Sequence, residues 1–358
     1  MDIVTHGLAS LAVARGFFPR AGKAAIASAV LGGCIADIDW LSNYFGPSAF
    51  LTWHGTYTHS ILAAILISLL ILPIPVATIR RKGLFILLPA PEAEATHVAR
   101  DAARNRALRT LFMVTLAAPL CAALLHIAMD ACQSNGVMLF WPFISRRFAA
   151  DWLPRIDPWI LTILIACIAL PELLHLVSSE IGAKSKKPRG QTGAIIGLAL
   201  VFVYVGARAI LHSNVVALME SRTFHGETPR RVSVFPEALS ILAWHGVVET
   251  ESAVSEIDVD AASPQAFDAD SSVRQFKPDP SPALDAARNT IVARRFLATA
   301  QIPKASLEKT EAGYVVVLRD LRYAAAGETA HEIAAVIELD LNNKVTSQEL
   351  VWARDLRH

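Results

Sequence analysis

Four long apolar stretches before residue 212 constrain the fold of this chain more than any other feature. A bilayer core requires about 20 mostly apolar residues in a helix that crosses it. The four candidate stretches are residues 60–79, 110–132, 159–176 and 192–211. Two shorter apolar segments, 7–18 and 24–36, precede them and fit either a helical hairpin or a partial dip into the bilayer. We therefore expect residues 1–212 to form a membrane-embedded, all-α bundle of four long and two short helices.

Composition agrees with a membrane protein. Hydrophobic residues make up 53% of the chain, whereas soluble domains contain about 45–50% apolar residues on a count that includes glycine. The net charge of +1 gives no indication of nucleic-acid binding. Asp2 stands where a signal peptide carries positive charge, so we expect the N-terminus to be retained.

Basic loops predict the orientation of the helices. Arginine and lysine gather in the loop 80–106 and again in 184–189, and such loops stay on the cytoplasmic side. Residues 133–156 and the chain after residue 212 then lie on the opposite side. We expect a multi-pass protein of a bacterial inner membrane with a periplasmic C-terminal domain.

Metal-capable side chains gather in the first third of the chain. Imidazole and carboxylate ligands hold catalytic zinc, manganese or iron, and ionisable groups are costly beside hydrocarbon. The predicted topology places the candidates near the outer ends of their helices, where they can form one site. They are His6, Asp37, Asp39, His54, His59, His126 and Asp130.

Two of these groups have a structural alternative. His126 and Asp130 share a helix face at a spacing of four residues, as zinc ligands do, but a hydrogen-bonded pair between membrane helices has the same pattern. Asp37 and Asp39 follow a helix, where the dipole disfavours carboxylates. A solvated loop would explain one aspartate there, and two favour ligation.

The remaining histidines lie near expected helix starts. His54 and His59 occupy a turn in which Thr58 or Ser60 can cap the next helix, and two histidines there favour ligation. His6 is the weaker case, because Thr5 can cap the first helix with His6 in its first turn.

Five ordered motifs resemble one family. "MDIVTHGLASLAVAR", "IADIDWL", "HGTYTHSIL", "LLHIAMDACQSNGVMLFWPF" and "RIDPWIL" are similar to the YdjM-type family of inner-membrane-associated, metal-dependent hydrolases, some of which are LexA-regulated. The resemblance covers most of residues 1–210, and "FPEALSILAW" and "LRDLRY" resemble its longer members. It implies that the seven residues above are ligands, and that Asn135 and Asp157 support the site or contact substrate.

Two positions qualify the resemblance. Asp157 precedes Pro158, which is also a good helix start with aspartate as the cap. Residues 55–57 read Gly-Thr-Tyr, where the family leads us to expect Arg-Gly and a small or aromatic residue. A contact to an anionic substrate would then be absent or supplied by another group, such as Arg146.

These observations predict a hydrolase with one or two divalent ions, zinc before manganese or iron. Asp37, Asp39, His59 and Asp130 are the expected catalytic residues. A site at the headgroup level suits a lipid-like or phosphorylated substrate among the membrane lipids, cleaved through metal-activated water. The alternative is a non-enzymatic membrane protein with a structural metal, an ion pathway, or an anchor for the C-terminal domain.

Residues 213–358 differ in composition and predict a small α+β domain. Residues 249–282 are acidic and rich in Ser, Asp and Pro, which is typical of a linker. A helix is expected over 283–300, and strands over 314–318, 334–339 and 345–352, with "LNNK" as a turn. "LRDLRY" fits a salt-bridged strand end or, less well, a binding patch.

Overall fold

The computed structural model describes residues 1–19, 22–71, 102, 105–106, 109, 112–180, 190–263, 265–325 and 332–356. The chain divides into two compact units. The first comprises Met1–Ile38, Gly55–Ala149 and Arg155–Val205, and the second comprises Asp39–His54, Ala150–Pro154 and Gly206–His358.

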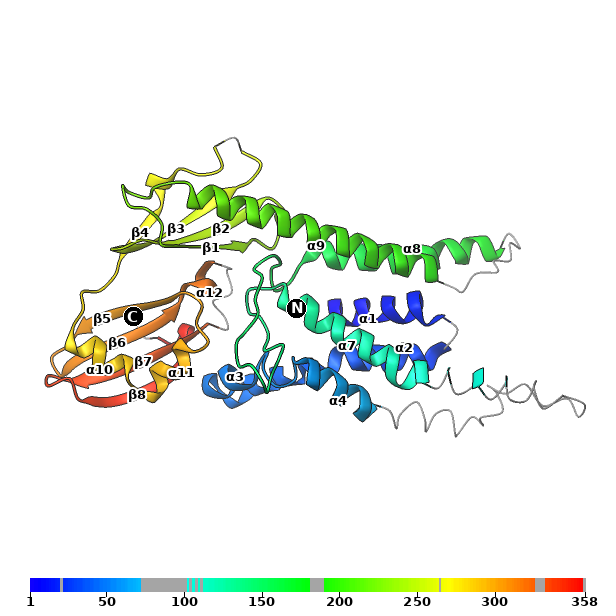
Figure 1. The fold of residues 1–358 in the computed structure, drawn as a ribbon, viewed down its shortest axis with the longest axis horizontal. Coiled ribbons are helices and arrows are strands. Elements are labelled where there is room, and N and C mark those ends of the chain that lie inside the picture. The colour runs from blue at the N-terminus through cyan, green and yellow to red at the C-terminus, as the bar shows by residue number, and fades with distance from the viewer. Residues whose placement is uncertain are drawn as a thin grey trace, which may run out of the picture. The chain divides into compact units, whose positions relative to one another are not determined.

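The first unit is helical, and its helices α1, α2, α4 and α7 pack against one another (Figure 1). Helix α1 also contacts α8. The bounds are α1 Ile3–Phe17, α2 Gly22–Cys34, α4 Ile61–Ile71, a π-helical turn Met113–Ala117 that continues into α7 Ala118–Ala131, and α8 Pro158–Glu180. Helix α9, Gln191–Glu220, begins in this unit and ends in the second.

Polar side chains cap α1 and α4. Asp2, and not the expected Thr5, caps α1, because its Oδ1 accepts a hydrogen bond of 2.9 Å from the Thr5 amide. Ser60 Oγ accepts from the amide of Ala63 at the start of α4, as one of the two sequence alternatives predicted. Each cap satisfies amides that the first turn of a helix leaves without a partner.

Glycines allow α2 to approach its neighbours closely. A Cβ atom on Gly33 would lie 1.9 Å from Ser10 Oγ of α1, and one on Gly32 would lie 2.6 Å from the Pro119 carbonyl oxygen of α7. Larger residues would separate the three helices. The glycine pair therefore fixes the distance between the elements that supply most of the site described below.

One helix among the described residues, α9, is long and apolar enough to cross a membrane. The bundle of four long helices is therefore not confirmed. Helices α1, α4 and α7 are apolar but shorter, and the apolar described part of α8 is Pro158–Leu173. Much of the predicted span 60–79 and the basic loops 80–106 and 184–189 lie wholly or largely outside the described residues.

The second unit contains two antiparallel four-stranded sheets, with strand orders β1-β2-β3-β4 and β5-β6-β7-β8. The first has β1 Arg231–Pro236, β2 Ala243–Glu249, β3 Ala253–Asp260 and β4 Val273–Phe276. The second has β5 Pro303–Lys309, β6 Gly313–Asp320, β7 Ile333–Asp340 and β8 Val345–Trp352. Its helices are α3 Pro47–Trp53, α10 Pro282–Arg288, α11 Ile291–Leu297 and α12 Leu321–Ala325, and the 3₁₀ helix Ile35–Phe45 enters it from the first unit.

Each sheet buries its own apolar core. The end of α9 packs on the first sheet, where Met219 and Trp244 are fully buried. Helices α10 and α11 cover the second sheet, with Phe296 against Val316 and Ile337 in the core. A further buried cluster joins the two sheets and includes Phe235 of β1 and Leu321 of α12.

Two expectations for this region need correction, and a third is confirmed. Residues 249–282 hold β3 and β4 rather than a linker, because Val254, Ile257 and Val259 alternate into the core between acidic residues on β3. The helix expected over 283–300 is two helices, since the Thr290 side chain accepts from the Ala293 amide and starts α11. In "LRDLRY", Asp320 accepts from the amides of Gln301 and Ile302 and pairs with Arg322, which is the salt-bridged strand end.

Candidate metal centre

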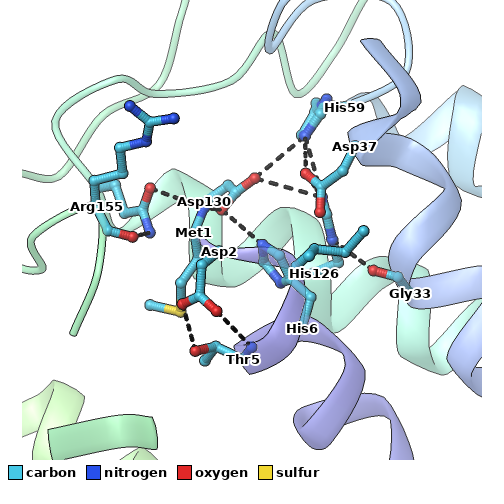
Figure 2. Close-up of polar contacts among 12 residues, drawn as sticks. Met1, Asp2, Thr5, His6, Gly33, Asp37, His59, His126, Asp130 and Arg155 are labelled. Carbon is cyan, nitrogen blue, oxygen red and sulfur yellow. Dashed lines mark hydrogen bonds and ion pairs between the residues drawn. The ribbon is translucent and has the colours of Figure 1, made fainter. Parts of the chain in front are cut away.

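Five side chains of the first unit converge at one place (Figure 2). Four of them, His6, Asp37, His126 and Asp130, offer ligand atoms that all lie within 4.8 Å of one another. The fifth, His59, joins them through its Nε2 atom, 3.1 Å from His126 Nε2. The sequence predicted all five, and the structure brings them together from four segments.

The fold positions each side chain near a helix end. His6 lies in the first turns of α1, and Asp37 follows the end of α2 by three residues. His59 precedes α4, while His126 and Asp130 lie in the last turns of α7. Two helices thus begin and two end beside the cluster, so the site occupies one end of this helical group.

Asp130 lies at the centre of the cluster. Its Oδ1 is 3.1 Å from His6 Nε2, and its Oδ2 is 3.2 Å from His59 Nε2 and 3.4 Å from His126 Nε2. Asp37 Oδ1 is 3.7 Å from the Nε2 atoms of both His59 and His126. Three imidazole nitrogens therefore face two carboxylates through the same ring atom.

The backbone fixes the protonation of His126. Its Nδ1 lies 2.7 Å from the Gly33 carbonyl oxygen, which can only accept, so Nδ1 donates. Nε2 of the neutral ring therefore carries a lone pair directed into the cluster. Such a second hydrogen bond from the outer ring nitrogen is the usual way in which proteins orient a metal-ligating histidine.

His59 has an analogous outer contact, between its Nδ1 and the Thr58 hydroxyl at 2.9 Å. When Nδ1 donates to Thr58 Oγ1, the Nε2 lone pairs of His59 and His126 face each other at 3.1 Å. A cation between them removes that repulsion. In the other tautomer, His59 Nε2 carries the proton and donates to His126. Either a proton or a cation could therefore lie between the two Nε2 atoms.

The cluster is buried but not sealed. His6, His59 and His126 are at most 2% exposed, whereas the Asp37 and Asp130 side chains retain 14% and 11%. Burial alone would raise the pKa of Asp37, but the hydrogen bond with His59 and the charges of His126 and His6 outweigh it. The pKa of Asp37 lies below its ordinary value, so this group is a carboxylate at neutral pH.

Two buried atoms of the cluster lack hydrogen-bond partners in the protein. They are Asp37 Oδ2 and His6 Nδ1. Buried polar atoms are normally paired, and those that are not commonly mark a place for water, an ion or a ligand. The Asp37 side chain is the most exposed of the five, whereas its Oδ2 atom is itself buried.

Sequence reasoning missed Gln133 and Thr58 as supports of the site. Gln133 is 2% exposed, and its side chain donates to the Arg155 carbonyl oxygen at 3.4 Å and accepts from the Met1 amino group at 3.1 Å. The same amino group contacts Asp130. Gln133 follows Asp130 by three residues and His126 by seven, so helical spacing was the available signal.

The predicted ligands Asp39 and His54 belong to the second unit. There they form a pair of their own, with His54 Nδ1 3.1 Å from Asp39 Oδ1. The Asp39 side chain is 1% exposed, and the His54 ring stacks on Phe50 with centroids 4.6 Å apart. Hydrogen bonding and stacking thus account for the two residues without an ion.

The three expected auxiliary residues make contacts of their own. Asp157 is fully buried, accepts from the Trp159 and Ile160 amides and from the Tyr204 hydroxyl, and so caps α8. Asn135 offers its backbone carbonyl to Arg147, 3.5 Å away. Arg146 is exposed and lies over the Phe148 ring.

Arg147, rather than the expected Arg146, is the arginine beside Gly55. A Cβ atom at Gly55, whose φ is 67°, would lie 2.9 Å from Arg147 Nη1. The loop after α7 is also joined to this turn by the hydrogen bond from the Met138 amide to the Gly55 carbonyl oxygen. The glycine at position 55 therefore leaves room for this guanidinium.

The donor set fits a divalent cation. Three neutral imidazole nitrogens and two carboxylate oxygens are the ligand types of zinc, manganese and iron sites. Two buried carboxylates close to each other are costly unless cations or hydrogen bonds compensate them. These five residues could hold a metal ion, and their identity alone does not select among these metals.

The fold and the site together define a helical, membrane-associated protein with a His/Asp cluster and a C-terminal α/β region. The family model described as "YdjM inner membrane protein" matches residues 1–215. This chain belongs to that family, as its motifs predicted, and the family places it at the inner membrane.

The C-terminal region has a match of its own. Residues 282–357 match the family model "YfhP C-terminal alpha/beta plait domain", which covers α10 through β8. No curated protein and no solved structure matches the chain.

Proposed function

We propose that this protein is a membrane-bound, metal-dependent hydrolase that cleaves a phosphate- or ester-linked lipid at the outer face of the inner membrane. The convergence of His6, His59 and His126 Nε2 atoms on the Asp37 and Asp130 carboxylates carries this proposal. Membership in an inner membrane family supports the lipid part of it.

The five converging residues would hold the ion. A divalent cation supplies Lewis acidity, which polarises the bond to be cleaved and lowers the pKa of the attacking water. One ion accounts for these five donors. A second ion, which the sequence left open, requires donors beyond them.

Asp37 and His126 have distinct tasks in this proposal. The low pKa of Asp37 keeps its carboxyl group ionised. Its Oδ2 atom has no hydrogen-bond partner in the protein and can accept a hydrogen bond that orients a water molecule. The Gly33 carbonyl holds His126 in the tautomer with a bare Nε2. Asp130 directs both oxygens toward the three histidines.

The position of the cluster supports a headgroup-level substrate. The site lies where α1 and α4 begin and α2 and α7 end, and the same helices expose apolar side chains such as Ile3, Leu66 and Leu69. A site at the end of apolar helices can meet the phosphate or ester of a lipid while the acyl chains remain beside the helices.

Metal analysis and a lipid hydrolysis assay test the proposal together. Detergent-purified wild type should contain about one equivalent of metal and hydrolyse phosphomonoester or carboxylic-ester lipids. His59→Ala and Asp37→Asn should lose both properties, while His225→Asn, a histidine change outside the cluster, should lose neither. Circular dichroism would verify that each variant remains helical.

Different failures have different meanings. Absence of metal in wild type purified without chelator would refute the metal centre. Bound metal without hydrolysis of any lipid tested, and an unchanged lipid composition in a His59→Ala strain, would refute the hydrolase and favour a structural metal or an ion pathway.

A further inference from the structure

Residues 39–54 leave the helical unit and pack in the second unit with the C-terminal domain. They depart two residues after Asp37 and return five residues before His59. Both flanking residues belong to the five-residue cluster. The excursion is therefore covalently attached to two candidate ligands, one at each of its ends.

An apolar contact holds the excursion on the C-terminal domain. Phe50 of α3 is 7% exposed and clusters with Ile333 and with Trp352 at the end of β8. The Phe50 and Trp352 ring centroids are 5.6 Å apart. Leu350 of β8 packs both on this cluster and on the core beneath α10 and α11, so α3 is continuous with the core of the second sheet.

A polar contact closes the base of the excursion. Asp39 and His54 are its first and last residues, and their side chains are 3.1 Å apart. His54 also stacks on Phe50, and its amide donates to the Phe50 carbonyl oxygen at 3.0 Å. A series of contacts thus runs from Trp352 to Phe50 and on to His54. The chain then continues from His54 into the turn that carries His59.

We infer that the C-terminal α/β domain positions the metal centre through residues 39–54, with Asp39, His54, Phe50 and Trp352 acting as positioning residues and not as ligands. This inference rests on the proposed metal centre. Fixing the two ends of a loop reduces the conformational freedom of the residues attached to them. Ligands held in advance by their surroundings bind a metal more tightly, commonly by about 10–100-fold.

The first measurement is zinc affinity of the full-length protein in detergent, by competition with a chromophoric chelator. Phe50→Ala and Trp352→Ala should each weaken zinc binding by about 10-fold or more. Trp352→Phe keeps an aromatic ring and should retain most of the wild-type zinc affinity. Val259→Ala removes a side chain from the core of the first sheet, which shares no residue with the Phe50 cluster. Zinc affinity of this control should equal that of wild type.

A second pair of variants separates positioning from ligation. His54→Gln keeps a donor for Asp39 and should bind zinc nearly as wild type does, whereas His54→Ala should bind it more weakly. Loss of zinc in His54→Gln as complete as in His59→Ala would make His54 a ligand and overturn the inference. Unchanged affinity in Phe50→Ala and Trp352→Ala would overturn it as well.

Hydrogen–deuterium exchange of the metal-free protein gives a readout that does not need zinc. The amides of residues 55–60 should exchange faster in Phe50→Ala than in Val259→Ala, and equal exchange would count against the inference. Wild type that binds no zinc would instead refute the proposed metal centre itself. The two failures are therefore distinguishable.

Discussion

Two groups of histidine and carboxylate in this molecule have similar composition and different geometry. In the first unit, three histidines direct Nε2 atoms toward the same two carboxylates. In the second, one histidine, His245 of β2, lies between two carboxylates of β3. Asp258 is 2.8 Å from its Nδ1 and Glu256 is 3.6 Å from its Nε2.

The difference concerns where the donor atoms point. Opposite nitrogens of one imidazole point away from each other, so the carboxylates around His245 stabilise a positive ring. In the first group, the Nε2 atoms of several rings converge on one place, which is what an ion requires. Convergence of donor atoms, rather than residue type, distinguishes a candidate metal centre from a salt-bridged histidine.

The largest expected effect is on metal affinity. His126→Ala removes a donor whose tautomer is fixed by Gly33, and we expect zinc affinity to fall by about 100-fold or more. His245→Ala should leave it unchanged. Chelator competition measures the zinc affinity of both variants. Equal losses of affinity would mean that the two groups of histidine and carboxylate do not differ as metal sites.

Close packing behind the cluster gives the next effect. Gly33→Ala places a methyl group 1.9 Å from Ser10 Oγ, which we expect to cost about 1–3 kcal/mol of stability and to weaken zinc binding. Adding Ser10→Ala removes that oxygen and leaves the Ser10 Cβ, 3.1 Å away, as a nearby contact. The double variant should therefore regain part of both losses in thermal unfolding and zinc titration, and no recovery would contradict this account.

A smaller effect, on stability and not on zinc affinity, is expected for Asp157, which lies outside the five-residue cluster. Asp157→Ala removes the cap of α8 and the Tyr204 contact, so we expect a loss of about 1–2 kcal/mol in the free energy of unfolding. Zinc affinity should remain that of wild type, and Asp157→Asn should retain most of the stability. A large loss of zinc with normal stability would return Asp157 to the site.

The smallest effect is a pH dependence at His245. Burial lowers the pKa of His245, but hydrogen bonds and charges of Glu256 and Asp258 outweigh burial and raise it above its ordinary value. A raised pKa in the folded state stabilises the protein below about pH 6.5. That contribution is lost as the pH rises through the folded-state pKa.

Comparison of wild type with His245→Gln measures this contribution. Wild type should be the more stable by a few tenths of a kcal/mol to about 1 kcal/mol at pH 6, and the difference should shrink toward pH 8. Hydrogen exchange of β2 and β3 at several pH values reports it. A difference that grows with pH would reverse the assigned sign.

The sequence predicted every residue of the cluster, but it also predicted two ligands that belong to the second unit. All five converging residues were expected, because membrane helices seldom carry ionisable groups without a use. Asp39 and His54 were grouped with them because the predicted topology put all of them on one membrane face, yet the chain enters a different compact unit at Asp39. Packing of Phe50 on Trp352, more than 300 residues later in the chain, decides that path, and no local pattern encodes such a contact.

In the C-terminal region, strands were predicted within the residues of β6, β7 and β8, but β3, which lies in the acidic segment, was not. Strand β8, Val345–Trp352, has the expected bounds. Strand β3 reads Ala-Val-Ser-Glu-Ile-Asp-Val-Asp, and its acidic positions alternate with apolar ones. Composition counted over a window hides this period of two, so an acidic strand was mistaken for a linker.

The contact between His126 and Gly33 has a consequence for how mutation can affect the site. Its acceptor is a main-chain carbonyl, so every amino acid at position 33 still carries that oxygen. A substitution can displace the acceptor, by forcing α2 away from α1, but cannot delete it. The tautomer of His126 is therefore set by the path of the backbone rather than by another side chain. A mutation at position 33 can change that tautomer only by changing the spacing of the helices.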